Sequence, residues 1–146
     1  MKNMYVKLAI MAIVSFIAMY LLIYSMIERW ADFYPSVSMA YMAGSMAAAM
    51  VIVELIVMSS MYENAKLRNI LIGSSTLLLI ASVVCTRNQT GIYDADFLRS
   101  MIPHHSGAIL MCANEKLDDP EIKELCREII DGQQREIEKM KTLMQK

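Results

Sequence analysis

Long apolar runs separated by short polar breaks dominate the first part of the chain. The first run, Leu8 to Ile27, is 20 residues long and carries no charged side chain. A helix needs about 20 apolar residues to cross a bilayer core of about 30 Å. The pattern therefore predicts a membrane domain over residues 1–86 with three transmembrane helices, at about 8–27, 36–60 and 69–86.

The first apolar run has a second interpretation, a cleaved signal peptide. The apolar core of such a peptide is usually about 7–15 residues long, and a small-x-small cleavage site follows it. The run in this chain is longer, and no such site follows it. We therefore expect the first helix to be retained as a membrane span.

The apolar pattern changes over residues 87–146 to that of amphipathic helices. Asp94 is a suitable N-cap for a helix over about 94–117, and Asp119 followed by Pro120 is a strong start signal for a second helix over about 120–144. Since the break between the two helices is short, they should run antiparallel as a hairpin. The predicted fold class is all-α. Apolar and weakly polar positions recur at three- and four-residue steps along the second helix at Ile122, Cys126, Ile129, Gln133, Ile137, Met140 and Met144.

Composition and charge narrow the function. The chain is 56% hydrophobic and 20% charged with a formal net charge of -1, which argues against disorder and against nucleic-acid binding. Basic residues flank the first and third spans at Lys2, Lys7, Lys66 and Arg68, whereas the first loop carries Arg29 alone. The positive-inside rule then predicts a multi-pass protein of the plasma (inner) membrane, with a cytoplasmic N-terminus and an extracytoplasmic hairpin.

Two motifs in the hairpin carry a family resemblance. The first reads Asp96-Phe97-x-x-x-Met101-Ile102-Pro103-His104-His105-x-x-Ala108-Ile109-x-Met111, and the second reads Gln133-x-x-Glu136-Ile137-x-x-Met140. They resemble a family of ferritin-like domains of unknown function with a MIPHH run and a QxxEIxxM second helix. The resemblance implies an exported or membrane-attached helical bundle, of which the hairpin would form half. Some members of that family are periplasmic copper-binding proteins.

The same residues favour a metal site on chemical grounds. On a helix, Met101 lies one turn before the pair His104 and His105, and Met111 and Cys112 lie two turns after it. Folding the hairpin brings Cys126 level with Cys112, Gln133 level with His104, and Met140 near Met101. Thioether, thiolate and imidazole ligands together suit Cu(I). The predicted metal ligands are His104, His105, Met101, Met111, Met140, Cys112 and Cys126. The alternatives are that each methionine fills a core and that the histidines are solvated.

A second methionine pattern lies in the membrane part. Met39, Met42, Met46 and Met50 recur at three- and four-residue steps along the second predicted span. Such a stripe could pass or collect Cu(I) ions, but for the stripe alone the pattern favours lipid contact or helix packing. Near the end of the same span, we expect Glu54 to pair with Arg68 across the short second loop.

Three functions remain after these arguments. The favoured hypothesis is a membrane-anchored copper-binding protein that acts in storage, tolerance or delivery and is not an enzyme. Its expected partners are the lipid bilayer, a second copy of the chain in a homodimer or higher oligomer, and a copper-delivery partner that the sequence does not identify. The first alternative is a structural or assembly protein with a His pair that binds no metal. The second is a ferritin-like di-iron enzyme, which would need Glu-x-x-His motifs that this chain lacks.

Overall fold

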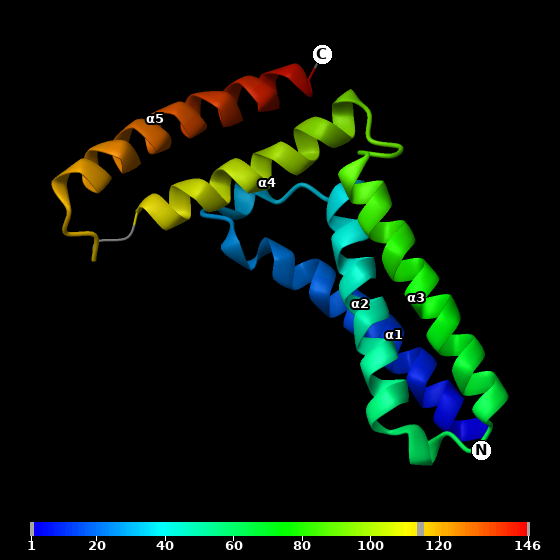
Figure 1. Cartoon of the computed structure of the whole chain (residues 1–146). Helices are drawn as coiled ribbons and strands as arrows, with labels where there is room; N and C mark the ends of the chain where they lie inside the picture. Colours follow the sequence, from blue (N-terminus) through cyan, green and yellow to red (C-terminus); the bar gives the residue numbers. More distant parts are fainter. Residues whose placement is uncertain (1, 114–115, 146) are drawn as a thin grey trace. The chain divides into compact units, whose positions relative to one another are not determined.

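The computed structural model describes residues 2–113 and 116–145, and this part of the chain is helical (Figure 1). Its α-helices are α1 Lys2–Ile23, α2 Val37–Val57, α3 Ala65–Arg87, α4 Asp94–Cys112 and α5 Pro120–Leu143. Short 3₁₀ turns lie at η1 Tyr24–Met26, η2 Trp30–Asp32 and η3 Ser59–Met61. No strand occurs among these residues, so the all-α prediction is confirmed. The ferritin-like half bundle stays a prediction.

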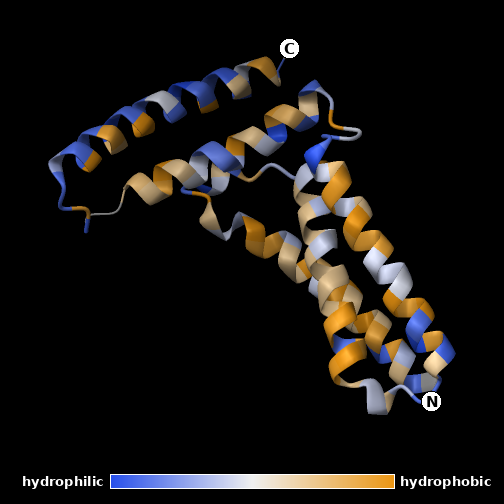
Figure 2. Ribbon diagram, viewed as in Figure 1, coloured by the Kyte–Doolittle hydropathy of each residue, from blue (hydrophilic) through white to orange (hydrophobic). Residues whose placement is uncertain are grey.

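Three helices are long and apolar enough to cross a membrane, namely Asn3–Met26, Val37–Val57 and Ala65–Arg87. Figure 2 shows hydrophobic residues prevailing along α1 and α2. The bounds differ from those predicted, since α1 begins at Lys2 and α2 ends at Val57. Helix α3 begins at Ala65 because the Asn64 side chain caps it by accepting a hydrogen bond from the Leu67 backbone N–H at 3.0 Å.

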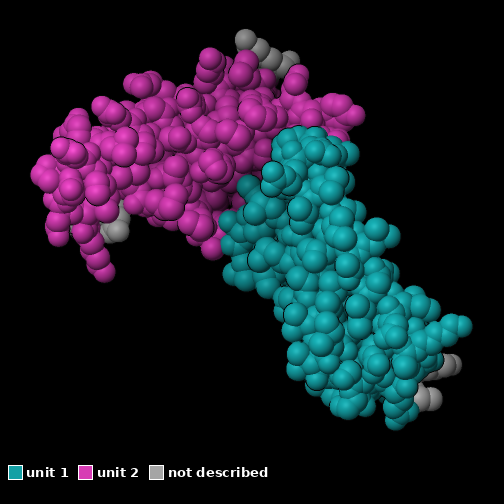
Figure 3. Space-filling view, in the orientation of Figure 1, with its two compact units in different colours: residues 1–23, 38–90 teal, residues 24–37, 91–146 magenta. Residues whose placement is uncertain are grey.

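The chain divides into two compact units (Figure 3). The first unit comprises residues 1–23 and 38–90, and the second comprises residues 24–37 and 91–146. The loop between α1 and α2 therefore belongs to the same unit as the hairpin. The predicted domain division, with residues 1–86 as the membrane domain, instead includes this loop in the membrane domain.

One end of the first unit is held by an apolar cluster of Leu8, Val51, Leu55 and Tyr62. The Tyr62 hydroxyl donates to Glu54 Oε1 at 3.1 Å, and its pKa is raised by burial and then by this hydrogen bond to the carboxylate. Arg68 donates instead to the Ser59 carbonyl at 3.0 Å. The expected pairing of Glu54 with Arg68 is therefore wrong. The Glu54 carboxylate binds the Tyr62 hydroxyl instead, and the Arg68 guanidinium binds the Ser59 carbonyl.

A cavity of about 800 Å³ lies among α1, α2 and α3 in this unit. Small residues of α2 create the space, including Ala40, Gly44, Ala47 and Ala48. The space is not fully enclosed, because it opens at the surface of the helix bundle.

The second unit is built on the antiparallel pair α4 and α5, which Figure 1 shows side by side. Its core consists of Ile102, Ile109, Ile137 and Met140, against which Tyr34 from the loop also packs. Helix α5 begins at Pro120 as predicted, and the Asp119 carboxylate accepts a hydrogen bond from the Glu121 N–H at 2.8 Å. Helix α4 ends at Cys112, earlier than the predicted residue 117. Of that predicted extension, Asn114 and Glu115 lie outside the described residues.

Candidate metal and thiol site

His105 occupies the seam between α4 and α5 and is 6% exposed. Its Nδ1 lies 2.9 Å from the Met101 carbonyl oxygen, and its Nε2 lies 2.7 Å from Glu136 Oε2. A carbonyl can only accept, so Nδ1 donates to it, and Nε2 is within hydrogen-bond distance of the Glu136 carboxyl group. Both ring nitrogens are therefore engaged, and His105 would have to release Glu136 before it could bind a metal through Nε2.

His104 has a different environment, because it is exposed to solvent. The two imidazole rings are 5.9 Å apart between centroids and meet at an interplanar angle of 63°. Successive side chains on an α-helix diverge by about 100°, so this geometry is expected. The His pair does not converge on a common point.

The predicted thioether ligands are also divided. Met140 is part of the buried core, and Met101 packs against the same cluster, so these two lie together. Met111 is 59% exposed and takes no part in this core. Nearby, Gln133 Oε1 is buried and accepts no hydrogen bond from the described residues.

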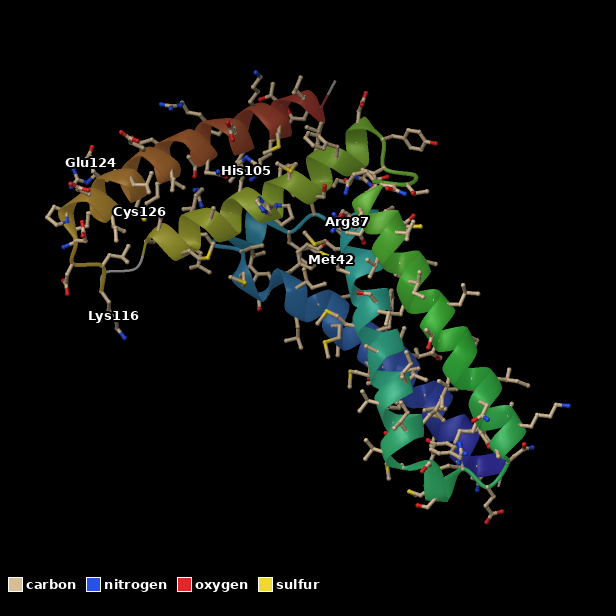
Figure 4. All side chains as sticks on the ribbon, in the orientation of Figure 1. Met42, Arg87, His105, Lys116, Glu124 and Cys126 are labelled. Carbon is tan, nitrogen blue, oxygen red and sulfur yellow. The ribbon has the colours of Figure 1, made fainter. Side chains whose placement is uncertain are left out.

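Cys112 and Cys126 are brought together, as their equal distance from the hairpin turn predicts. Cys126 Sγ donates to Cys112 Sγ at 2.7 Å, and both residues are half-buried free cysteines. Burial, followed by the hydrogen bond and the charge of Cys126, raises the pKa of Cys112 to about 11. Figure 4 labels Cys126 on α5, near the hairpin turn, with His105 on α4.

The seven predicted ligands therefore form no single centre. No three His, Cys, Asp or Glu side chains in residues 2–113 and 116–145 lie close enough together to hold one metal ion. The structure offers instead a thiol pair at Cys112 and Cys126, a buried thioether pair at Met101 and Met140, and the exposed His104 and Met111.

A second polar cluster in this unit was missed by sequence reasoning. Ser106 is completely buried, and its Oγ donates to Asp32 Oδ2 at 2.8 Å while accepting from the Glu28 N–H at 2.9 Å. Lys141 forms an ion pair with Asp32 Oδ1 at 2.6 Å. The partners are 74 to 109 residues apart in sequence, so no local pattern predicts the cluster. Only the two small neighbouring residues Ser106 and Gly107 indicate that another segment lies close to α4 there. A Cβ on Gly107 would lie 3.3 Å from the Met26 carbonyl oxygen, so the helix is small where the loop crosses it.

Comparison with known proteins places this geometry in a family. Residues 84–144, which include both helices of the hairpin, match the family described as Domain of unknown function (DUF305). The chain is also 35% identical over 141 residues to "Uncharacterized protein L153" of Acanthamoeba polyphaga mimivirus, a similarity that covers 92% of this chain and 89% of that protein. The chain belongs to the DUF305 family. No solved structure is significantly similar to it.

DUF305 membership confirms the predicted relation to a family of unknown function. The ferritin-like architecture and the copper chemistry that the resemblance implied stay predictions. The similarity to the mimiviral protein extends over nearly the whole chain and so includes most of the membrane-type helices as well as the hairpin.

The two histidines should differ in their effect on stability. Replacing His105 by alanine removes a buried ring with two hydrogen bonds, so we expect His105→Ala to lower the free energy of unfolding by about 2–4 kcal/mol. His104→Ala is the matched control on the same turn and should change it by less than about 0.5 kcal/mol. Urea denaturation of the purified protein gives the free energy of unfolding of each variant, with protease cleavage within α4 and α5 as the readout of unfolding. Equal losses in the two variants would contradict the assignment.

The raised pKa of Cys112 predicts slow alkylation at neutral pH. Only the thiolate reacts with iodoacetamide, so the rate at Cys112 should rise about tenfold per pH unit and level off near pH 11. Mass spectrometry of the Cys112 peptide gives the rate, in a Cys85→Ser background. Because Cys126 contributes to the shift, Cys126→Ala should move the midpoint to lower pH. A midpoint at or below the ordinary thiol value of 9.0 would contradict this result.

Proposed function

We propose that this protein is a membrane-anchored metal-binding protein that handles copper on the extracytoplasmic face, in storage, tolerance or delivery. The observation that carries the proposal is the thiol pair, with Cys112 Sγ and Cys126 Sγ 2.7 Å apart on two packed helices. Thiolates are soft ligands and favour Cu(I) over harder ions. Two thiols that meet on packed helices can supply two ligands to one ion, and their sulfurs would move apart to admit it.

Proton release is part of this binding. Cys112 holds its proton at neutral pH, since its pKa is raised to about 11. A Cu(I) ion that binds its sulfur must displace that proton, so affinity should fall as pH falls, by about tenfold per unit for one proton released. The exposed His104 and Met111 lie seven residues apart on α4, about 10.5 Å along the axis, and would each offer a single ligand to an arriving ion.

His105 supports the structural alternative for its own position. Its two hydrogen bonds are those of a residue that joins α4 to α5, and they leave Nε2 free only if Glu136 moves away. The copper proposal therefore depends on the cysteines, with His104 and the methionines as secondary ligands. A di-iron enzyme gains no support from the described residues, among which no three His, Cys, Asp or Glu side chains are grouped around one point.

The proposed topology is three spans with a cytoplasmic N-terminus and an extracytoplasmic hairpin. The loop at residues 24–37 and the hairpin at residues 91–146 form one compact unit. With three spans, the first loop and the segment after the third span lie on the same side of the membrane. The packing of the loop with the hairpin supports this arrangement, and the Lys and Arg distribution supports the direction.

We also propose that the protein self-associates. The hairpin exposes large apolar side chains that its own two helices do not cover, at Phe97, Met111, Ile122 and Leu125. Two such hairpins would close a four-helix bundle and bury these faces. A homodimer is the smallest assembly that does so.

A Cu(I) competition titration tests the metal proposal. The detergent-purified full chain, reduced and kept anaerobic, should hold Cu(I) against a chromophoric chelator. Cys112→Ser/Cys126→Ser should weaken binding at least about a hundredfold, because hard hydroxyls replace soft sulfurs. Cys85→Ser is the matched control and should bind as wild type does. His104→Ala/His105→Ala measures the share of the imidazoles. Unchanged binding in the double cysteine variant would refute the thiol site, and a wild-type chain that holds no Cu(I) would refute the copper proposal.

Topology is tested by labelling in intact cells. In a background without Cys85, Cys112 and Cys126, a membrane-impermeant maleimide should label Arg135→Cys on α5 without lysis. Ser60→Cys, in the loop between α2 and α3, should be labelled only after lysis, because one span, α2, separates it from the extracytoplasmic first loop. The reverse pattern would invert the orientation, and equal labelling of both positions would exclude three spans.

A further inference from the structure

The cavity among α1, α2 and α3 is walled almost wholly by hydrocarbon. Gly44 marks the point where the three helices approach one another. A Cβ placed there would lie 3.5 Å from Ser82 Oγ on α3 and 4.0 Å from Phe16 Cε2 on α1. The small side chains of α2 thus keep a space open that larger residues would fill.

Two tyrosines line the cavity, and both turn their hydroxyls toward loops. The Tyr5 hydroxyl donates to the Asn64 carbonyl at 3.4 Å, in the loop before α3. The Tyr41 hydroxyl donates to the Thr90 carbonyl at 3.0 Å, in the loop after α3. The phenol rings therefore border the cavity near both ends of α3, and their polar atoms are engaged outside it.

The size and chemistry of the cavity decide what can occupy it. Water needs two to four polar partners at each position, which these walls do not provide. A helix about 10 Å wide that crosses about 30 Å of hydrocarbon has a volume of roughly 2,400 Å³, about three times that of the cavity. A flexible chain of methylene groups is narrow enough to enter, and such chains surround a protein in a bilayer.

We propose that the cavity binds an acyl chain of a membrane phospholipid, which completes the packing among α1, α2 and α3. The inference rests on the membrane placement proposed above. The bound acyl chain would fill the space between the three helices, in contact with Phe16 on α1, Ala48 on α2 and Leu71 on α3. The volume falls within the 300–1,000 Å³ range of sites that enclose small apolar ligands.

Photolabelling of the full chain in lipid nanodiscs tests this site. Phosphatidylcholine with a diazirine in its acyl chain is irradiated in the discs, and the adducts are mapped by mass spectrometry. We expect adducts on cavity residues such as Phe16 and Leu71. Gly44→Leu fills the space and should reduce these adducts at least about fivefold. Gly73→Leu is the matched control, because a Cβ at Gly73 meets nothing within 4 Å, and it should leave the labelling unchanged.

A second variant and three outcomes keep the test decisive. Ala12→Leu fills the cavity from α1, so it replaces Gly44→Leu if circular dichroism shows that the latter loses helix. Equal labelling of cavity residues in all variants would overturn the proposal. A chain that is not retained in the discs would refute the membrane placement as well, whereas retention without cavity adducts refutes the lipid site alone.

Discussion

The second unit depends on one buried carboxylate. Asp32 is 3% exposed, and a buried charge is tolerated only when it is paired and hydrogen-bonded. Ser106 on α4 and Lys141 on α5 supply the two partners, so a single side chain of the loop holds both helices of the hairpin. A two-helix hairpin alone buries little apolar surface. The loop at residues 24–37 packs against α4 and α5 and adds a third layer to the hairpin. Farther along the same two helices, Cys112 on α4 meets Cys126 on α5.

That register separates chemical roles which the sequence placed together. The MIPHH run draws attention to two adjacent histidines, yet one faces the seam and the other faces solvent, as a step of about 100° requires. The seam histidine is engaged through both ring nitrogens by Met101 and Glu136. The soft sulfur pair lies two turns farther along, near the hairpin turn. The motif therefore combines a residue that binds the helices to each other with neighbours that remain available to a ligand.

Local patterns predicted the elements well, and contacts between distant segments poorly. Apolar run length placed three spans, and Asp119 with Pro120 placed the start of α5, because caps and periodicity act within a few residues. The alignment of Cys112 with Cys126 followed from counting to the turn. The hydrogen bond between His105 and Glu136 lies in the same stretch of the two helices where that count sets His104 opposite Gln133. No local pattern announced the contacts of Asp32 with Ser106 and Lys141. Glu54 likewise binds Tyr62 and not Arg68, because tertiary packing decides which side chains meet.

The protonated state of Cys112 has a consequence for its reaction with oxidants. Since its pKa is raised to about 11, Cys112 is held as the thiol at neutral pH. Peroxides and disulfides react with thiolates, so they find almost no nucleophile at this sulfur, and its loss to oxidation is slow on kinetic grounds. A soft cation is under no such restriction, because it forms its bond as the proton leaves. The burial that raises the pKa of Cys112 therefore also slows the reaction of its sulfur with oxidants.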